Sequence, residues 1–266
     1  MTTAARASSA KHVPVDATRK TALVAGILYL LTFASSIPAA LLLGATLDTP
    51  NYILGAGADG QIRLAALFDI INGLTAIGTA VALYSVLKRQ HEGFAIGFVA
   101  SRLFEAAILF IGIVSVVTIA NLRDAGAAGA DPTSLGAVGT ALVALYKTSF
   151  VLGTGIPALN AVLLGWLLYR SGLVPRAIPV IGLIGAPLFT SWIVGYIFGV
   201  TEGGTAWHAI GVAPIFVWEL ALGLWMTFKG FRASAVAELG FSPSDPASAA
   251  PAVTPQGIVA TKAGPA

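Results

Sequence analysis

Charged side chains inside long apolar runs are the residues of this sequence best suited to chemistry. They are Asp69, Arg102, Glu105, Lys147 and Glu219. A charge in the hydrocarbon of a membrane is costly, so such residues usually face the protein interior, pair with one another, or mark a path for protons or ions. We therefore expect these five side chains to point away from lipid.

Three of these charges are expected at the same depth. Arg102 lies nine residues after Gly93, near the start of its apolar run, and Glu219 lies ten residues before Lys229, just after its own run. At about 1.5 Å of rise per helical residue, Arg102 lies about 14 Å, Glu219 about 15 Å and Glu105 about 18 Å from the same side. Arg102 and Glu105 also share a helix face. The spacing predicts that Arg102 meets both carboxylates.

One positive charge against two carboxylates leaves one negative charge in surplus. A buried carboxylate without a partner is disfavoured as an anion, so we expect one of the two to keep a proton. Two interpretations of this cluster stay open. It is either a static clamp that holds helices in register or a relay for protons or cations that opens toward the cytoplasm.

A stripe of small and polar residues follows one face of the second apolar run. Its members are spaced by four, three, four and three positions: Ala65, Asp69, Asn72, Ala76 and Thr79. Asp69 lies about 28 Å from Lys88, nearer the outer side. The stripe either lines a water-filled cavity or bonds neighbouring helices together. Lys147, near the outer end of its run, either extends to the surface or meets Asp69.

Other kinds of chemistry have little support in the sequence. There is no Cys, and His12, His91 and His208 are the three His residues, so we expect no metal site. No HExxH, G-x-S-x-G or P-loop motif is present, and no nucleophile and base stand at an informative spacing. The sequence predicts no cofactor and favours a function that is not enzymatic.

The composition indicates which elements must position the charges. Hydrophobic residues make up 56% of the 266 residues and charged residues 10%, and the mean hydropathy is +0.85. A soluble domain carries about 25% charged residues, so a soluble enzyme or a nucleic-acid-binding protein is excluded. Six apolar runs reach the roughly 20 residues that a membrane crossing needs. They are 22–47, 62–87, 94–122, 142–169, 177–200 and 209–228. We predict an all-α integral membrane bundle of six transmembrane helices.

Basic residues gather on one side of this arrangement. With the N-terminus inside, eleven Lys and Arg residues fall on the cytoplasmic side and two, Arg63 and Arg123, on the outer side. The positive-inside rule then places both termini in the cytoplasm, with the lipid bilayer of the plasma membrane as the main partner. We expect a flexible N-terminus over residues 1–20, a transmembrane domain over 21–231, and a disordered Ala/Pro/Ser-rich tail over 232–266.

Residues 170–176, Arg-Ser-Gly-Leu-Val-Pro-Arg, predict a tight cytoplasmic turn between two spans. Gly172 permits a positive φ at the end of a helix, and Pro175 can begin the next one. Arg170 and Arg176 are expected to face the anionic inner leaflet. The turn is either a structural hairpin or a binding loop.

Several motifs resemble those of one family. They are Arg-Leu-Phe-Glu-Ala at 102–106, Tyr-Arg-Ser-Gly-Leu-Val-Pro-Arg at 169–176 and Trp-Glu-Leu-Ala-Leu-Gly-Leu-Trp at 218–225. Together they resemble the bacterial membrane family catalogued as domain of unknown function 4386. The resemblance implies a multi-pass membrane bundle and supplies no catalytic or cofactor residues.

Three classes of function stay open. The leading one is a non-enzymatic membrane protein that handles a small solute or a proton, or that acts as an accessory or sensor subunit. The alternatives are an intramembrane enzyme acting on lipid and a structural partner of another membrane protein. A homo-oligomer or a complex with another membrane protein is compatible with each.

Overall fold

The computed structural model describes residues 17–48, 52–54, 59–127 and 129–240. Six helices are long and apolar enough to cross a membrane. They are α1 (Ala17–Leu47), α2 (Asp59–Leu87), α3 (Glu92–Ala127), α4 (Pro132–Ser171), α5 (Ala177–Ile197) and α6 (Ala206–Phe228), followed by the short α7 (Ala233–Glu238). The described residues contain no strand. The predicted all-α bundle of six membrane-long helices is confirmed.

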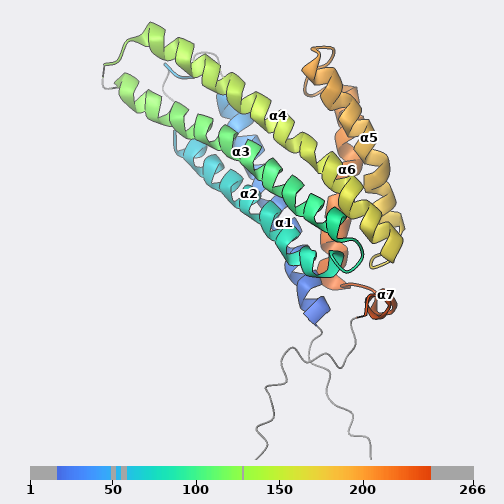
Figure 1. Ribbon diagram of the computed structural model, residues 1–266. Helices are drawn as coiled ribbons and strands as arrows, with labels where there is room; N and C mark the ends of the chain where they lie inside the picture. Colours follow the sequence, from blue (N-terminus) through green and yellow to red (C-terminus); the bar gives the residue numbers. More distant parts are fainter. Residues whose placement is uncertain (1–16, 49–51, 55–58, 128, 241–266) are drawn as a thin grey trace, which may run out of the picture.

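The six long helices pack in chain order. Each contacts the next one along the chain, and α6 packs back against α1, so the sequence of contacts closes into a ring. Figure 1 shows α1 to α4 as a bundle of long helices, with the α5–α6 pair inclined away from α3 and α4 at the upper end of the view. Side chains that point into this ring are shielded from lipid, so this is where buried charges can lie.

The two ends of the bundle differ in charge. The end at which α1 begins and α6 ends, which we call the basic end, carries Arg19, Lys20, Lys88, Arg89, Arg170, Arg176, Lys229 and Arg232 (Figure 1). The opposite, acidic end carries Asp48, Asp59, Asp124, Asp131 and Glu202, together with Arg63 and Arg123. The charge asymmetry read from the sequence therefore corresponds to two physical ends of the molecule.

The interior of the bundle is apolar on both sides of a polar layer. One cluster of buried side chains, including Leu83, Leu164 and Trp192, extends from the basic end along α5 and α6. A second, including Leu43 and Ile119, fills the half toward the acidic end. Many large apolar side chains point outward instead. An outer surface of this kind is stable in contact with lipid chains and not with water.

Helix boundaries differ from the expected spans mainly where polar groups decide them. Helix α4 begins at Pro132, ten residues before the expected span, because the Asp131 side chain accepts a hydrogen bond from the Ser134 backbone N–H at 2.9 Å and Pro132 occupies the first helical position. A capping side chain and a proline at the first helical position favour the start of a helix whatever the hydropathy of the residues there. Helix α5 ends at Ile197 instead of residue 200, and Gly199 follows with a positive φ.

Two helical segments lie where the sequence analysis places irregular chain ends. Helix α1 already begins at Ala17, and α7 covers Ala233–Glu238. The reason for α7 is tertiary, since Ala235 and Val236 are buried against the core near the basic end. The rest of the expected flexible N-terminus and tail, residues 1–16 and 241–266, lies outside the described residues.

The expected turn at 170–176 is present. Gly172 ends α4 with a φ of 65°, and its N–H donates to the Leu168 carbonyl at 3.0 Å. Only a residue without a side chain adopts this left-handed conformation without strain.

Candidate functional site

Arg102 of α3 is the centre of the polar layer. Its side chain is 2% exposed. One terminal nitrogen, Nη1, lies 3.0 Å from Oε2 and 3.3 Å from Oε1 of Glu105, one turn further along α3. The other, Nη2, lies 2.6 Å from Oε1 of Glu219 on α6. The predicted meeting of Arg102 with both carboxylates is therefore present, and it joins two helices that are far apart in the sequence.

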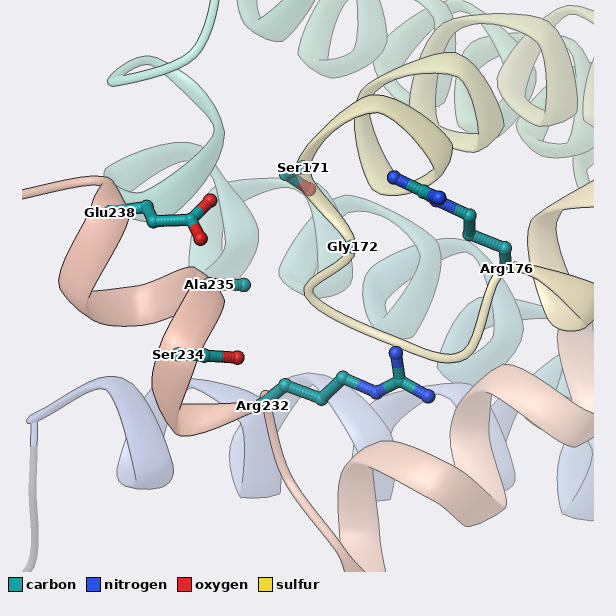
Figure 2. A pocket seen from close by; sticks show the side chains of 7 residues that line it. All are labelled: Ser171, Gly172, Arg176, Arg232, Ser234, Ala235 and Glu238. Carbon is teal, nitrogen blue, oxygen red and sulfur yellow. The ribbon is translucent and has the colours of Figure 1, made fainter.

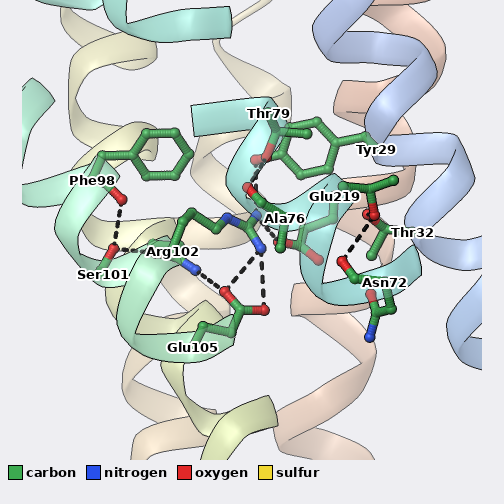
Figure 3. Close-up of polar contacts among 12 residues, drawn as sticks. Tyr29, Thr32, Asn72, Ala76, Thr79, Phe98, Ser101, Arg102, Glu105 and Glu219 are labelled. Atoms are coloured by element: carbon green, nitrogen blue, oxygen red, sulfur yellow. Dashed lines mark hydrogen bonds and ion pairs between the residues drawn. The ribbon is translucent and has the colours of Figure 1, made fainter. Parts of the chain in front are cut away.

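Two further helices contribute polar side chains to this cluster (Figure 3). From α1, the Tyr29 hydroxyl accepts a hydrogen bond from Nη2 of Arg102 at 3.0 Å. From α4, Asn160 donates its amide to Oε2 of Glu105 at 2.7 Å and accepts a hydrogen bond from the Ser101 hydroxyl. One guanidinium thus organises side chains from four helices, and we call this set the Arg102 cluster: Tyr29, Ser101, Arg102, Glu105, Asn160 and Glu219.

Aromatic rings shield the guanidinium of Arg102. The ring of Tyr29 lies 5.3 Å and that of Phe98 5.7 Å from its central carbon. A cation over the face of an aromatic ring is attracted by the ring quadrupole. Together with the two carboxylates, these rings stabilise the positive charge of Arg102 in its buried position.

The two carboxylates are not equivalent. Glu105 accepts hydrogen bonds on both oxygens, from Arg102 and from Asn160. Among the described residues, Glu219 has Arg102 as its one hydrogen-bond partner, and only Oε1 takes part. Hydrogen bonds to the charged form stabilise a carboxylate anion. Glu105 is therefore the more fully hydrogen-bonded of the two carboxylates, and Oε2 of Glu219 accepts no hydrogen bond from a described residue.

Among the described residues, no hydrogen bond or ion pair connects Asp69 or Asn72 of α2 with the Arg102 cluster. Both are buried and face the interior, as the stripe on the second span predicts. The Asp69 carboxylate is 5% exposed, and no described residue forms a hydrogen bond or an ion pair with it. The structure thus brings together three of the five expected site residues and leaves these two outside the cluster.

Lys147 does not meet Asp69. Its ammonium group lies 2.6 Å from Oδ1 of Asp48, beyond the end of α1, and both side chains are more than half exposed. The expected alternative of a pair with Asp69 is wrong, and the extension of Lys147 to the surface is what occurs. A long flexible side chain near a helix end reaches polar surroundings at little cost.

The described residues hold no group of three or more His, Cys, Asp or Glu side chains that could bind a metal ion. The side chains of the Arg102 cluster can donate and accept hydrogen bonds, transfer protons and bind a small polar group.

The comparison with protein families decides what kind of molecule this is. Residues 24–230 match the model of the family described as Domain of unknown function (DUF4386). The chain belongs to DUF4386. No curated protein and no solved structure matches it. The matched region of this DUF4386 member contains the whole Arg102 cluster and Asp69, whereas Arg232 and α7 lie beyond it.

Tyr29 and Asn160 were not expected in the site, although the signal that finds them is simple. Asn160 is the one amide side chain in residues 142–169, and it lies eleven residues, about 16 Å, before Ser171. Tyr29 lies nine residues, about 14 Å, after Lys20. Both depths coincide with those of Arg102, Glu105 and Glu219. Extending the depth argument from charged to all polar residues would have identified both partners in this DUF4386 protein.

Proposed function

We propose that this DUF4386 protein binds and releases a proton at the Arg102 cluster while it handles a small solute in the membrane. The observation that supports this most is the unequal hydrogen bonding of two carboxylates around one buried guanidinium. Glu105 accepts bonds from Arg102 and Asn160, whereas Glu219 accepts one bond from Arg102. Glu219 is the proposed proton-binding residue.

Charge balance gives the proton its role. With both carboxylates ionised, the cluster carries one surplus negative charge in surroundings of low dielectric constant, which is unfavourable. A proton on Oε2 of Glu219 removes the surplus and leaves Oε1 able to accept from Arg102. When the proton leaves, a cation or a polar solute must take its place, or the helices must shift to let water reach the carboxylate.

Asp69 supplies a second position at a different depth. It lies eighteen residues before Leu87 in α2, about 27 Å from the basic end of that helix. The Arg102 cluster lies at about 14–18 Å, so Asp69 stands about 10 Å nearer the acidic end. Asn72 and Thr75 are buried on the same helix at about 22 Å and about 18 Å from that end, between the two levels. Polar side chains that lie between two buried carboxylates can support a route for protons across the bundle.

The orientation of the bundle is part of the proposal. We place the basic end in the cytoplasm and the protein in the plasma membrane of a bacterium, because basic residues concentrate on the cytoplasmic side of membrane proteins. The natural chain has no Cys, so a cysteine placed at Ser171 gives a label without background. An impermeant thiol reagent added outside intact cells should leave it unmodified. Rapid labelling would show that the basic end faces outward and would contradict the proposed orientation.

Proton movement is testable in sealed vesicles. Purified protein is reconstituted with a pH-sensitive dye inside, and a pH gradient is imposed from outside. The wild-type protein should dissipate the gradient faster than protein-free vesicles, and Glu219→Gln should lose this effect. Glu202→Gln is the matched control, because it changes the same side chain at an exposed position of the acidic end. Equal rates for wild type and Glu219→Gln would refute the relay and leave the static clamp.

Proton binding has a second readout that does not need transport. A protonated carboxyl group absorbs in the infrared at a frequency where a carboxylate does not. The wild-type protein should show such a band that is missing in Glu219→Gln and kept in Glu202→Gln. If the band is lost in Glu105→Gln instead, the proton belongs to Glu105 and the assignment to Glu219 is wrong.

A further inference from the structure

A pocket at the basic end of the molecule has no part in the proposed proton chemistry. It has a volume of about 470 Å³ and lies between the α4–α5 turn and α7. Figure 2 shows the turn on one side and α7 on the other, with the Glu238 carboxylate directed toward Ser171. Its polar lining consists of Ser171, Arg176, Arg232, Ser234 and Glu238.

The two arginines of the pocket, Arg176 and Arg232, have no ion-pair partner in the part of the chain that the structure describes. The guanidinium of Arg176 lies 5.7 Å from the ring of Tyr169, a contact that leaves its N–H groups available. Arginine N–H groups bind phosphate oxygens in a fixed fork geometry. Two such groups in one pocket suit a phosphate.

Glu238 adds the opposite charge to the same pocket. It forms no ion pair with either arginine in the part of the chain that the structure describes. A carboxylate that lines a pocket with two arginines and pairs with neither is suited to a ligand that carries both charges. A phosphate joined to a primary amine is a ligand of this kind, because its amine can donate to Glu238 while its phosphate faces the arginines.

The walls of the pocket are held in place by the rest of the fold. The Arg232 backbone N–H donates to the Leu173 carbonyl at 2.9 Å, which ties the start of α7 to the α4–α5 turn. Leu173 and Val174 of the turn are buried, as are Ala235 and Val236 of α7. A preformed site binds its ligand without the cost of ordering flexible segments.

The pocket lies at the depth of lipid headgroups. Trp166 and Tyr169, in the last turns of α4, are exposed on the outside of the bundle. Exposed Trp and Tyr side chains near the end of a membrane helix mark the level of the headgroups. Ser171 follows Tyr169 by two residues, about 3 Å of helix rise. A lipid alongside α4 can therefore present its headgroup to the pocket.

We propose that this pocket binds the headgroup of an aminophospholipid, with Arg176, Arg232 and Ser234 on the phosphate and Glu238 on the amine. The proposal does not depend on proton binding at the Arg102 cluster. It assigns a binding role to the α4–α5 turn and to α7. Helix α7 follows the region that matches the family.

Lipid binding can be measured by mass spectrometry of the intact protein in mild detergent. Phosphatidylethanolamine and phosphatidylglycerol with the same acyl chains are added in series, and the fraction of protein that retains each lipid is recorded. The double variant Arg176→Gln/Arg232→Gln should weaken phosphatidylethanolamine binding by about tenfold or more, since charge-assisted hydrogen bonds to phosphate are lost. Lys88→Gln is the control, because it removes one positive charge at the same end but outside the pocket.

Glu238→Gln separates amine recognition from charge attraction. It should reduce the preference for phosphatidylethanolamine over phosphatidylglycerol while binding of phosphatidylglycerol stays equal or rises. Unchanged lipid retention in the double arginine variant would overturn the site, and an unchanged preference in Glu238→Gln would overturn the amine contact. The changes are at exposed positions, and circular dichroism verifies that each variant is folded.

A soluble ligand is the other source of the same chemistry. Free phosphoethanolamine is therefore tested in the same spectrometer without added lipid. Binding of this compound that depends on Arg176 and Arg232, with no retention of the lipid, would overturn the membrane source. Retention of the lipid without binding of the free compound supports it.

Discussion

Replacement of Arg102 by Met, alone and together with Glu219→Gln, tests the charge balance of the polar layer. Arg102 lies 3.0 Å from Glu105 and 2.6 Å from Glu219, and it donates to Tyr29 at 3.0 Å. Removing the cation of a buried ion pair leaves its partners uncompensated and costs about 3–5 kcal/mol. Here two carboxylates lose their cation at once. We expect Arg102→Met to lower the free energy of unfolding by at least this amount.

Glu219→Gln alone should be much milder. The amide oxygen can replace Oε1 as the acceptor for Arg102, so one hydrogen bond changes from charged to neutral. Such bonds differ by about 1 kcal/mol. In the Arg102→Met background, Glu219 that has released its proton is a buried negative charge without a cation, so at a pH where it is ionised we expect the same substitution to stabilise the protein. The sign of the effect of Glu219→Gln therefore reverses between the two backgrounds.

The free energies come from denaturant titrations in mixed micelles, followed by circular dichroism for the four members of the cycle. The exposed pair of Lys147 and Asp48 provides the control cycle, with Lys147→Met and Asp48→Asn. Its coupling should stay below about 1 kcal/mol, because solvent screens exposed ion pairs. If Glu219→Gln destabilises both backgrounds equally, Arg102 and Glu219 do not interact energetically. The proposed charge balance of the polar layer is then refuted.

Two more predictions concern helix ends and helix contacts. Hydrogen bonds from the Ser134 side chain and then from its backbone N–H lower the pKa of Asp131 from its ordinary 3.8, so the cap stabilises α4 above that value and is lost as the pH falls through the lowered pKa. Carbon-13 NMR of the carboxyl group should show Ser134→Ala raising this pKa, and an unchanged titration would rule out the contribution of the Ser134 hydroxyl. Gly26→Ala places a Cβ within 2.9 Å of the Gly223 carbonyl of α6 and should cost about 1–3 kcal/mol in unfolding titrations. Gly44→Ala, with open space around it, should be neutral or stabilising, and equal effects at both positions would contradict the close contact of α1 with α6.

The depth of the buried charges was predictable because an α-helix rises by a constant amount, about 1.5 Å, per residue. Counting residues from Gly93 and Lys229 puts Arg102, Glu105 and Glu219 in one layer, and the cost of charge in lipid requires them to face inward. Depth does not give rotation about the helix axis or the identity of the neighbouring helix. This is why Tyr29 and Asn160, at the same depth, were not assigned as partners.

The errors have the same origin. Lys147 was expected either to extend to the surface or to meet Asp69, and the structure shows the first, with the ammonium group at Asp48. Which of two acidic residues a lysine meets depends on the packing of α1 against its neighbours, and that information is not in a single helix. The start of α4 was missed because the Asp131 cap, and not hydropathy, sets it. Helix α7 forms because Ala235 and Val236 pack against the hydrophobic core.

The arrangement of the ring gives protonation of Glu219 a structural consequence. Helix α6 packs against α5 and α1, and its ion pair with Arg102 reaches across the ring to α3. A proton on Glu219 turns this ion pair into a weaker hydrogen bond and reduces the attraction by about 1–2 kcal/mol. An energy of this size changes the ratio of two conformations by about 5- to 30-fold. Under the proposed function, the proton thus controls how firmly the α5–α6 pair is held to the rest of the bundle.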